Sequence, residues 1–486
     1  MLSNISDKSS TTSPLWPADA HIHLVGIGGA GLSAIAWVLL GRNYTVSGSD
    51  QTANARTQAL QEAGATIFIG HHPKNIDGAD LLLVSSAIPT TNPEYQAALT
   101  QNLPIYKRDR FLGHLMADAH GLAIAGTHGK TTTTGLLAEI FITANQDPTV
   151  IIGGVLPSWG VNGRAGQGPH FIVEADEYDH MFLGLRPQTA IITNIEHDHP
   201  DIFPTPQSYQ DAFHRFIQLL PPHGHLVTCY DDPGVQQFLN QPLPPNLITD
   251  TYGLDSNPNP THHHYHATDI RPNPLGGSDF LLTCFKADGS QQMLGLFRLR
   301  VPGDHNVRNA LAAIAVAHRQ NITIPQLQKA LISFGGVGRR FQITGEVGQV
   351  TIIDDYAHHP TEIRATLAAA RQQYPGRRIW AVWQPHTFSR TKLLLQEFAQ
   401  SFTNADRVIV LDIFRSREKD DLGLSSANVV AAMSHSDVIH IPERRQAADY
   451  LRDRVHPSDV VLTLGAGDGN EVGRWLLTDL QARIKN

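Results

Sequence analysis

The segment with the clearest chemistry is a glycine-rich loop, Gly126-Thr127-His128-Gly129-Lys130-Thr131-Thr132. It follows the apolar run 122–125, which predicts a strand, and it precedes an apolar run that predicts a helix. At such a turn, backbone N–H groups can surround phosphate oxygens, while Lys130 adds positive charge and Thr131 can ligate magnesium. Because the usual pattern has a glycine where this chain has Ile124, the segment predicts a shortened phosphate-binding loop. The alternative is a tight turn that carries a surface lysine.

A second glycine turn, Gly26-Ile27-Gly28-Gly29-Ala30-Gly31, follows the predicted strand 21–25 and opens an apolar helix. This pattern is typical of a dinucleotide-binding turn, and Asp50 stands about 20 residues downstream, at the end of the next predicted strand. It fits NAD, which makes an oxidoreductase one interpretation. It also fits a UDP-sugar, because that ligand carries a diphosphate too. A turn that only packs helix against strand is the third interpretation.

Two clusters of acidic and imidazole side chains follow further predicted strands, Glu174-Ala175-Asp176-Glu177 and Asn194-Ile195-Glu196-His197-Asp198-His199. The carboxyl ends of parallel strands meet at one edge of a sheet, so both clusters should lie near the phosphate loop. ATP chemistry needs magnesium to neutralise phosphate oxygens. Glu174 and His199 are therefore candidate ligands. The alternative for some of these charges is a solvated turn.

A third group of candidates lies in Asp354-Asp355-Tyr356-Ala357-His358-His359-Pro360 and in Gln384-Pro385-His386-Thr387-Phe388-Ser389-Arg390, each after a predicted strand. The carboxylate of an amino acid needs a cation, and the planar guanidinium of Arg390 can bind it through two parallel hydrogen bonds. His358 could orient that carboxylate or the amine. Helix caps and packed histidines are the alternative roles.

Around these motifs, strands and helices alternate along the whole chain of 486 residues, which exceeds the roughly 250 to 300 residues of a single core. We expect an α/β protein of three domains, each built on a mainly parallel sheet: Rossmann-like, P-loop-type and Rossmann-like in turn. The predicted ranges are 20–117, 118–338 and 339–486 after a disordered tail at 1–19, with a hinge near Gly338. The Pro-, Asn- and His-rich stretch 241–274 predicts surface loops, with irregular strands between them as an alternative, and its tract His262–His266 predicts a solvated loop more readily than a transition-metal site.

The composition favours a cytoplasmic protein with small ligands. No apolar stretch is long enough to cross a membrane, and the N-terminus lacks a secretory signal. The only cysteines, Cys229 and Cys284, are too few for a disulfide framework. A net charge of -8 argues against broad binding of nucleic acid. The oligomeric state does not follow from the sequence.

Together the motifs resemble the Mur ligase family of peptidoglycan synthesis, from about His21 to the C-terminus. The segments that carry the resemblance are Gly26–Ser33, Ser85–Pro89, Gly126–Thr132, Pro302–Asn306, Asp354–Glu362 and Gln384–Thr391. Within the family, the chain is most similar to members that join L-alanine to UDP-N-acetylmuramate. The resemblance implies a UDP-substrate domain, a central ATP-binding domain and a C-terminal amino-acid-binding domain, with ATP as a substrate and two magnesium ions.

The resemblance also implies roles for single residues. Lys130, Glu174 and His199 would be catalytic, and Thr131, Glu174 and His199 would hold magnesium. The ATP-binding residues would be Gly126, Thr127, His128, Gly129, Lys130, Thr131, Thr132, Asn306, Asn309, Arg340 and Asp355. The residues binding the UDP-substrate would be Gly28, Gly29, Ala30, Gly31, Ser49, Asp50, Ser85 and Ser86. Those binding the amino acid would be Tyr356, His358 and Arg390.

The implied reaction passes through an acyl phosphate, with Glu177 or His358 as the proton acceptor for the attacking amine. The chain departs from the family twice. It has no lysine between Pro200 and Leu220, where several members carry a carbamylated lysine, and it has Thr387 where some alanine-adding members have arginine. Three alternatives remain: a ligase for another amino acid or a peptide, an NAD-dependent oxidoreductase, and a catalytically silent nucleotide-binding regulator.

Overall fold

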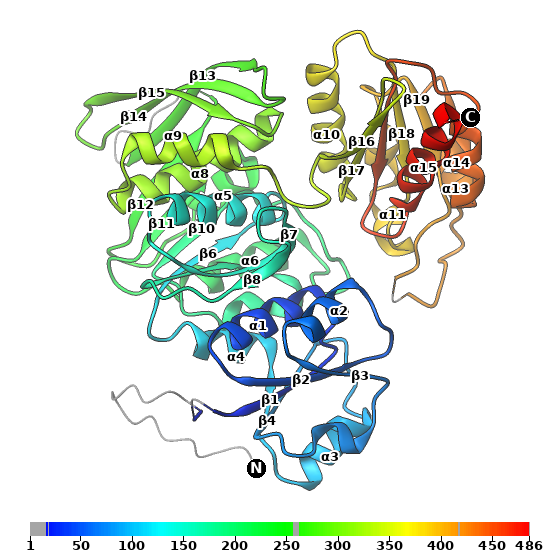
Figure 1. Ribbon diagram of the computed structural model, residues 1–486. Helices are drawn as coiled ribbons and strands as arrows, with labels where there is room; N and C mark the ends of the chain where they lie inside the picture. The colour runs from blue at the N-terminus through cyan, green and yellow to red at the C-terminus, as the bar shows by residue number, and fades with distance from the viewer. Residues whose placement is uncertain (1–15, 18, 256–261, 417, 486) are drawn as a thin grey trace.

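The computed structural model describes residues 16–17, 19–255, 262–416 and 418–485, which form three β-sheets with helices packed around each. Figure 1 shows the N-terminal unit in blue below the central unit in cyan and green, with the C-terminal unit in yellow to red beside the central one. The predicted α/β fold of three domains on mainly parallel sheets is confirmed. We propose that the domains span 20–117, 118–338 and 339–486. Most of the predicted tail, 1–19, lies outside the described residues.

The N-terminal sheet has the strand order β3-β2-β1-β4-β5, and all neighbouring strands run parallel. Its strands are β1 (His21–Val25), β2 (Thr45–Asp50), β3 (Thr66–Ile69), β4 (Leu81–Val84) and β5 (Ile105–Lys107). Its helices are α1 (Ala30–Gly41), α2 (Ala55–Glu62), the 3-10 helix η1 (Pro73–Ile76), α3 (Pro93–Thr100) and α4 (Arg108–Leu115). Because the strands are parallel, the glycine turn after β1, Asp50 and Ser85 share one edge of the sheet.

The central sheet has the order β15-β14-β13-β12-β11-β10-β6-β9-β7-β8, parallel from β13 to β7 and antiparallel at both ends. Its strands are β6 (His120–Ala125), β7 (Thr149–Leu156), β8 (Val161–Arg164), β9 (His170–Glu174), β10 (Thr189–Ile192), β11 (His225–Cys229), β12 (Ile248–Gly253), β13 (His263–Pro272), β14 (Ser278–Phe285) and β15 (Gln291–Leu299). Its helices are α5 (Lys130–Thr143), η2 (Tyr178–Gly184), α6 (Pro206–Ile217), α7 (Pro233–Leu239), α8 (Asp304–Arg319) and α9 (Ile324–Ser333). The carboxyl ends of β6, β9, β10 and β11 converge at one edge.

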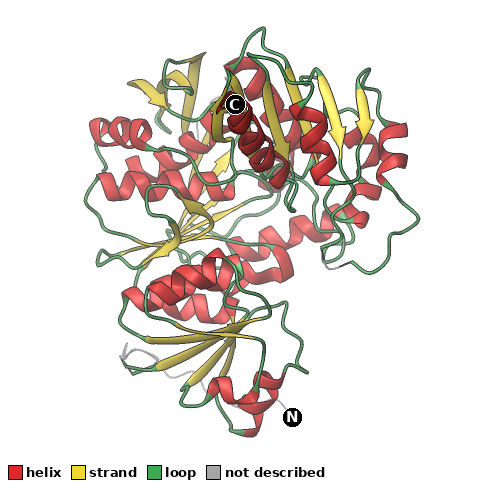
Figure 2. Cartoon of the chain, turned by 45° about the vertical axis from the view of Figure 1, so that its right-hand side comes forward, coloured by secondary structure: helices red, strands yellow, loops and turns green. Residues whose placement is uncertain are grey.

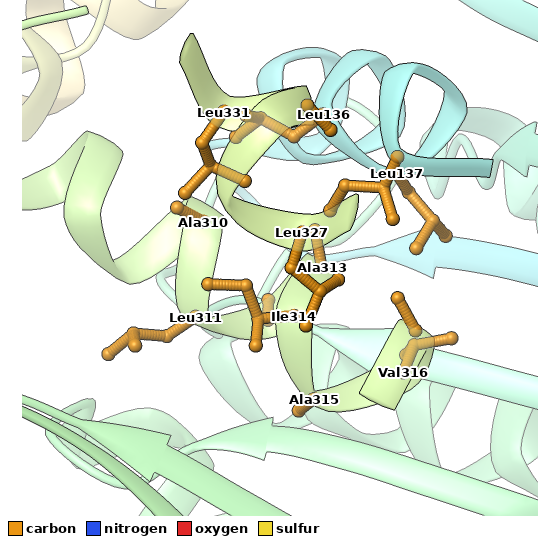
Figure 3. Packing of buried hydrophobic residues seen from close by; sticks show 14 of the residues in the cluster. Leu136, Leu137, Ala310, Leu311, Ala313, Ile314, Ala315, Val316, Leu327 and Leu331 are labelled. Carbon is orange, nitrogen blue, oxygen red and sulfur yellow. The ribbon is translucent and has the colours of Figure 1, made fainter. Parts of the chain in front are cut away.

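Helices α5, α8 and α9 form the centre of one of the two large apolar clusters among the described residues. Figure 3 shows Leu136 and Leu137 of α5 beside Leu327 and Leu331 of α9, with Ile314 of α8 next to them. All five side chains are fully buried. Burial of such a side chain contributes about 1.5–3 kcal/mol, so this cluster holds the helix that follows the phosphate loop firmly in place.

The stretch 241–274 contains two strands, β12 and β13, so the prediction of a solvated loop at His262–His266 is wrong. Both strands extend the parallel part of the central sheet, and the tract that predicted a solvated loop begins β13. His264 is fully buried and its Nδ1 lies 2.9 Å from the hydroxyl of Thr251. Pro272 is the last residue of β13, and the Thr and Tyr residues of both strands favour β structure. Residues 256–261 lie outside the described part of the chain.

The C-terminal sheet has the order β16-β17-β21-β18-β19-β20, with β16 antiparallel and the other pairs parallel. Its strands are β16 (Gln342–Val347), β17 (Val350–Asp355), β18 (Ile379–Trp383), β19 (Arg407–Val410), β20 (Val438–His440) and β21 (Val460–Leu464). Its helices are α10 (Pro360–Gln373), α11 (Phe388–Leu393), α12 (Leu395–Ala399), α13 (Ser426–Ala432), α14 (Arg444–Arg452) and α15 (Glu471–Lys485). Separate apolar clusters cover the two faces of this sheet.

Two junctions join the units. Helices lie between the N-terminal and central sheets in Figure 2, and Asn162 of β8 donates a hydrogen bond of 2.8 Å to the carbonyl of Ala30 at the start of α1. The central and C-terminal units are linked through 334–338, where Gly336 has a φ of +88°, which favours glycine. No described helix is both long and apolar enough to cross a membrane.

Candidate functional site

The predicted phosphate loop lies between β6 and α5, as the sequence indicated. Gly126 has a φ of +132°, and a Cβ placed there would lie 2.0 Å from the hydroxyl oxygen of Thr193 on the neighbouring strand end. A side chain is therefore excluded at this position. The Lys130 ammonium donates hydrogen bonds to the carbonyls of Gly126 at 2.6 Å and Thr127 at 3.0 Å, so it folds back over the loop.

Lys130 is surrounded by the acidic residues that follow β9. Its Nζ lies 2.9 Å from the carboxylate of Glu177, which is almost fully buried. Burial lowers the pKa of Lys130, but the charges of Glu177 and Asp176 raise it above its usual value, so Lys130 is a cation. The loop thus presents a fixed positive charge next to backbone N–H groups, as phosphate binding requires.

Thr131 and Glu174, two of the predicted magnesium ligands, are in direct contact. The Thr131 hydroxyl donates a hydrogen bond of 2.9 Å to Glu174, whose second oxygen accepts one of 2.7 Å from the backbone N–H of Gly153. A hydroxyl and a carboxylate beside a phosphate loop are the hard oxygen donors that magnesium prefers, so these two residues fit the ion.

His199, the third predicted magnesium ligand, makes different contacts. Its Nε2 lies 3.7 Å from Glu177 and 3.7 Å from Asp198. Glu177 also bonds Lys130, so a chain of contacts connects His199 to the phosphate loop through this carboxylate. A histidine among carboxylates at this edge of the sheet is compatible with a cation.

The loop residue His128 bridges the central and C-terminal units. Its Nε2 lies 3.0 Å from Glu196, and its Nδ1 lies 3.2 Å from Glu362 of α10. Burial lowers the pKa of His128, but the hydrogen bonds with these two carboxylates raise it to about 9. His128 is therefore an imidazolium held between two carboxylates. The Thr361 hydroxyl donates to Glu196 at 2.8 Å and adds a second link between the units.

A cavity of about 260 Å³ lies where these two units meet. It is lined by predicted ATP-binding residues from the phosphate loop, from α8 and from the start of the C-terminal unit, namely His128, Gly129, Thr132, Asn306, Asn309, Arg340 and Asp355. Asp355 accepts hydrogen bonds of 2.7 Å from the backbone N–H groups of Phe341 and Ala357, and burial raises its pKa to about 6. Sequence positions more than 200 apart thus share one pocket.

The predicted amino-acid-binding residues lie close to one another in the C-terminal unit. The rings of Tyr356 and His358 lie 5.2 Å apart, and the ring of His358 lies 5.9 Å from that of His386. Burial lowers the pKa of His358 to about 3, so its imidazole is neutral at pH 7. Arg390 makes two-pronged contact with Asp198, at 2.9 Å from Nη2 to Oδ1, and both side chains are buried.

The predicted residues for the UDP-substrate lie at one edge of the N-terminal sheet. The backbone N–H of Gly28 donates to the Asp50 carboxylate at 2.9 Å, and α1 begins directly after Gly29. A Cβ on Gly31 would lie 2.1 Å from the guanidinium of Arg108, a residue that the sequence did not single out. Arg108 also bonds Asp176 at 3.0 Å, so it connects the glycine turn to the central unit.

Models of Mur ligase domains match the chain in three consecutive segments. These are the Mur ligase family catalytic domain over 21–120, the Mur ligase middle domain over 124–317 and the Mur ligase glutamate ligase domain over 339–467. A UDP-N-acetylmuramate--L-alanine ligase of Geotalea uraniireducens is 42% identical over 95% of this chain and 98% of its own length. The chain belongs to the Mur ligase family. A second relative of this Mur ligase, the enzyme of the same name from Roseiflexus sp., is 40% identical over 95% of this chain and 99% of its own length.

Solved structures agree with this membership. The UDP-N-acetylmuramate-alanine ligase of Thermotoga maritima matches with a TM-score of 0.78 and 27% identity, covering 95% of this Mur ligase and 99% of that chain. A murein peptide ligase of Psychrobacter arcticus matches with a TM-score of 0.72 and 27% identity. The match covers 95% of this Mur ligase and 98% of that chain. The fold of this Mur ligase is therefore that of both ligases.

Sequence reasoning missed several residues around the cavity of this Mur ligase. Asp231 and Asp232 line the cavity, and Asp231 accepts a hydrogen bond of 2.7 Å from Arg308 of α8. The sequence could have indicated both aspartates, because they follow a buried strand, as do the acidic clusters at 174–177 and 194–199. Glu362 lay inside a recognised motif, but its contact with His128 depends on how the units pack.

Proposed function

We propose that this Mur ligase joins L-alanine to the carboxylate of UDP-N-acetylmuramate, with ATP converted to ADP and phosphate, in the synthesis of peptidoglycan precursors. The product is UDP-N-acetylmuramoyl-L-alanine. The observation that carries the proposal is that relatives bearing the name UDP-N-acetylmuramate--L-alanine ligase match 94–95% of the chain at 39–43% identity. The reaction is placed in the cytoplasm, where ATP and nucleotide sugars are available.

In the first step, the sugar carboxylate attacks the γ-phosphorus of ATP and ADP leaves, which gives an acyl phosphate. The backbone of Gly126–Thr132 and the cation of Lys130 stabilise charge on the phosphate oxygens. Thr131, Glu174 and His199 are the residues that would hold magnesium, which neutralises phosphate charge when it is bound. We assign Asn306, Asn309, Arg340 and Asp355 to ATP because they line the same cavity as the loop.

In the second step, the neutral amine of the amino acid attacks the acyl carbon, and phosphate leaves from the tetrahedral intermediate. A base must take a proton from the amine. Between the two candidates we favour Glu177, because its carboxylate lies 2.9 Å from Lys130 of the phosphate loop. Glu177 lies between Lys130 and His199, beside the predicted phosphate site.

The cavity between the central and C-terminal units suits a water-sensitive intermediate. Its wall combines the phosphate loop with Glu362 and Thr361 of α10, so bringing these units together shields an acyl phosphate from hydrolysis. The glycine turn of the N-terminal unit offers backbone N–H groups to a diphosphate. We assign the edge formed by Gly28, Gly29, Ala30, Gly31, Ser49, Asp50, Ser85 and Ser86 to the UDP-substrate.

The test is phosphate release from ATP in the presence of UDP-N-acetylmuramate and single amino acids. The proposal expects release that requires both the sugar and L-alanine, and its loss in Lys130→Ala. The matched control is Lys329→Ala, which removes an exposed lysine of α9 and should leave the rate unchanged. Phosphate release with another amino acid would assign the enzyme a different amino-acid specificity. No release with any amino acid would refute the proposed ligase activity.

A second candidate function is the attachment of a preformed peptide. The observation behind it is the murein peptide ligase of Psychrobacter arcticus, whose fold matches this chain with a TM-score of 0.72 and whose sequence is 27% identical, the same identity as for the alanine ligase. Both candidate reactions use the same ATP-binding residues. They differ in the substrate that supplies the amine, which is L-alanine in one and a peptide in the other. The same assay with the tripeptide L-alanyl-γ-D-glutamyl-meso-diaminopimelate in place of L-alanine separates them.

A further inference from the structure

The structure contains a buried ion pair that joins two units at the amino-acid-binding region. Asp198 follows β10 of the central unit, and Arg390 lies in α11 of the C-terminal unit, 192 positions later. Arg390 Nη2 lies 2.9 Å from Oδ1 and 3.2 Å from Oδ2 of Asp198, and its Nε lies 3.1 Å from Oδ1. The two side chains are only 6% and 7% exposed.

Three histidine side chains lie around the ion pair, and two of them are predicted to bind magnesium or the amino acid. Arg390 Nη1 lies 3.3 Å from the imidazole of His386, and His199 lies 3.7 Å from Asp198. The ring of His358 lies next to that of His386. The ion pair therefore lies among the predicted amino-acid-binding residues.

The two charges of this pair are the complement of a free amino acid. An α-amino acid at neutral pH carries one carboxylate and one ammonium. A guanidinium binds the first with two hydrogen bonds, and a carboxylate binds the second. Removing a single partner from a buried pair is costly, because it leaves an unpaired charge. A zwitterion that replaces the contact leaves both charges paired.

The location of the pair makes such an exchange possible. Each member belongs to a different unit, and the link between those units contains Gly335, Gly336 and Gly338. Asp198 and Arg390 can therefore move apart when the units separate, without unfolding either sheet. A pair within one rigid unit would not offer this path.

We propose that Asp198 binds the ammonium group of the amino-acid substrate while Arg390 binds its carboxylate, so that the zwitterion replaces the ion pair between the units. This inference rests on the proposed function, and it adds Asp198 to the residues that contact the amino acid. A ligand with a carboxylate but no ammonium can satisfy Arg390 alone and leaves Asp198 unpaired.

The experiment measures the KM for L-alanine and the inhibition constant of L-lactate, which has a hydroxyl in place of the ammonium. In Asp198→Asn we expect the KM for L-alanine to rise about tenfold or more, while the KM values for ATP and UDP-N-acetylmuramate stay within about twofold. L-lactate should inhibit this variant at an equal or lower concentration, because Arg390 has lost its competing partner. In Arg390→Lys, both L-alanine and L-lactate should bind more weakly.

The control is Asp279→Asn, which breaks another two-pronged carboxylate–guanidinium pair, with Arg298 on the β14–β15 hairpin. Its kinetic constants should match those of the unaltered protein. If thermal melting shows that Asp198→Asn does not fold, Asp198→Glu takes its place, with a smaller rise in the KM for L-alanine expected. A parallel loss of L-alanine and L-lactate binding in the Asp198 variant, or a fall in kcat alone, would overturn the inference and leave the pair as a contact that only holds the units together.

The two proposals fail in different ways. The proposed function fails when the unaltered protein does not use L-alanine. If it uses another amino acid, the same comparison of variants is made with that amino acid and its 2-hydroxy analogue. The inference on Asp198 fails when the unaltered protein is active and its Asp198 variant shows no selective change in the KM for the amino acid.

Discussion

His128 in the phosphate loop and Glu362 in α10 are 234 positions apart in the sequence, and their side chains lie 3.2 Å apart. Glu362 also accepts a hydrogen bond of 3.0 Å from the backbone N–H of His358 and lies 3.6 Å from Arg340. One carboxylate thus connects the phosphate loop with a predicted ATP-binding residue and a predicted amino-acid-binding residue. The approach of α10 to the loop assembles all three.

Replacing Glu362 by Gln should weaken this assembly. The hydrogen bonds that Glu362 makes with His128 and His358 involve a charged group, and such bonds contribute about 1.5–3 kcal/mol. We expect the KM for ATP to rise roughly tenfold and the melting temperature to fall, because the contact between the two units also stabilises the fold. Steady-state kinetics measures this. Glu397→Gln, at an exposed position of α12, is the control, and an ATP KM within twofold of normal in the Glu362 variant would contradict the prediction.

The same contact predicts a pH dependence of stability. The folded pKa of His128 is raised to about 9, from 6.5 for the unperturbed group. Its stabilising contribution is therefore complete below pH 6.5 and is lost as the pH rises through about 9. We expect the difference in melting temperature between the unaltered protein and His128→Gln to shrink between pH 7 and pH 10. A difference that stays constant over this range would show that His128 is not held as an imidazolium.

Glu174→Gln tests the magnesium assignment. The amide can still accept the hydrogen bond from Thr131, but it loses the negative charge that a divalent cation requires. We expect the magnesium concentration for half-maximal activity to rise about tenfold or more. The measurement is a magnesium titration of phosphate release, with Asp288→Asn in an exposed turn as the control. An unchanged titration would remove Glu174 from the ligand set.

Glu94 should be a stabilising residue of the N-terminal unit. Its fully buried carboxylate accepts hydrogen bonds from Ser49 at 2.5 Å and from Asn75 at 2.6 Å. Burial raises its pKa, but the nearby imidazole of His23 and the hydrogen bonds from Ser49 and Asn75 lower it to about 2. Its contribution is thus present above pH 4.5 and is lost as the pH falls through about 2.

We expect Glu94→Gln to destabilise this unit by about 1.5–3 kcal/mol at pH 7, because the variant removes a charged acceptor from a buried network. Thermal or urea unfolding measures the change. Glu62→Gln, at an exposed end of α2, should have no effect. Equal stability of the Glu94 variant and the unaltered protein would mean that the network does not depend on the charge.

The elements and the phosphate loop could be predicted from the sequence because they depend on neighbouring residues. Gly126 to Thr132 are contiguous, and a glycine turn between an apolar strand and an apolar helix specifies its own backbone path. Likewise, polar residues at the ends of successive strands predicted one shared edge, because parallel strands must place their carboxyl ends together.

Only the tertiary structure decided which distant residues meet. The sequence contained Asp198 and Arg390 in separate motifs, but their contact depends on how α11 of one unit packs against the end of β10 in another. The tract beginning at His262 predicted a loop, yet β12 provides a strand beside it and buries His264. Local sequence sets turns and periodicity through backbone preferences and spacing. Contacts between units and burial within a sheet depend on surfaces that exist only after each unit has folded.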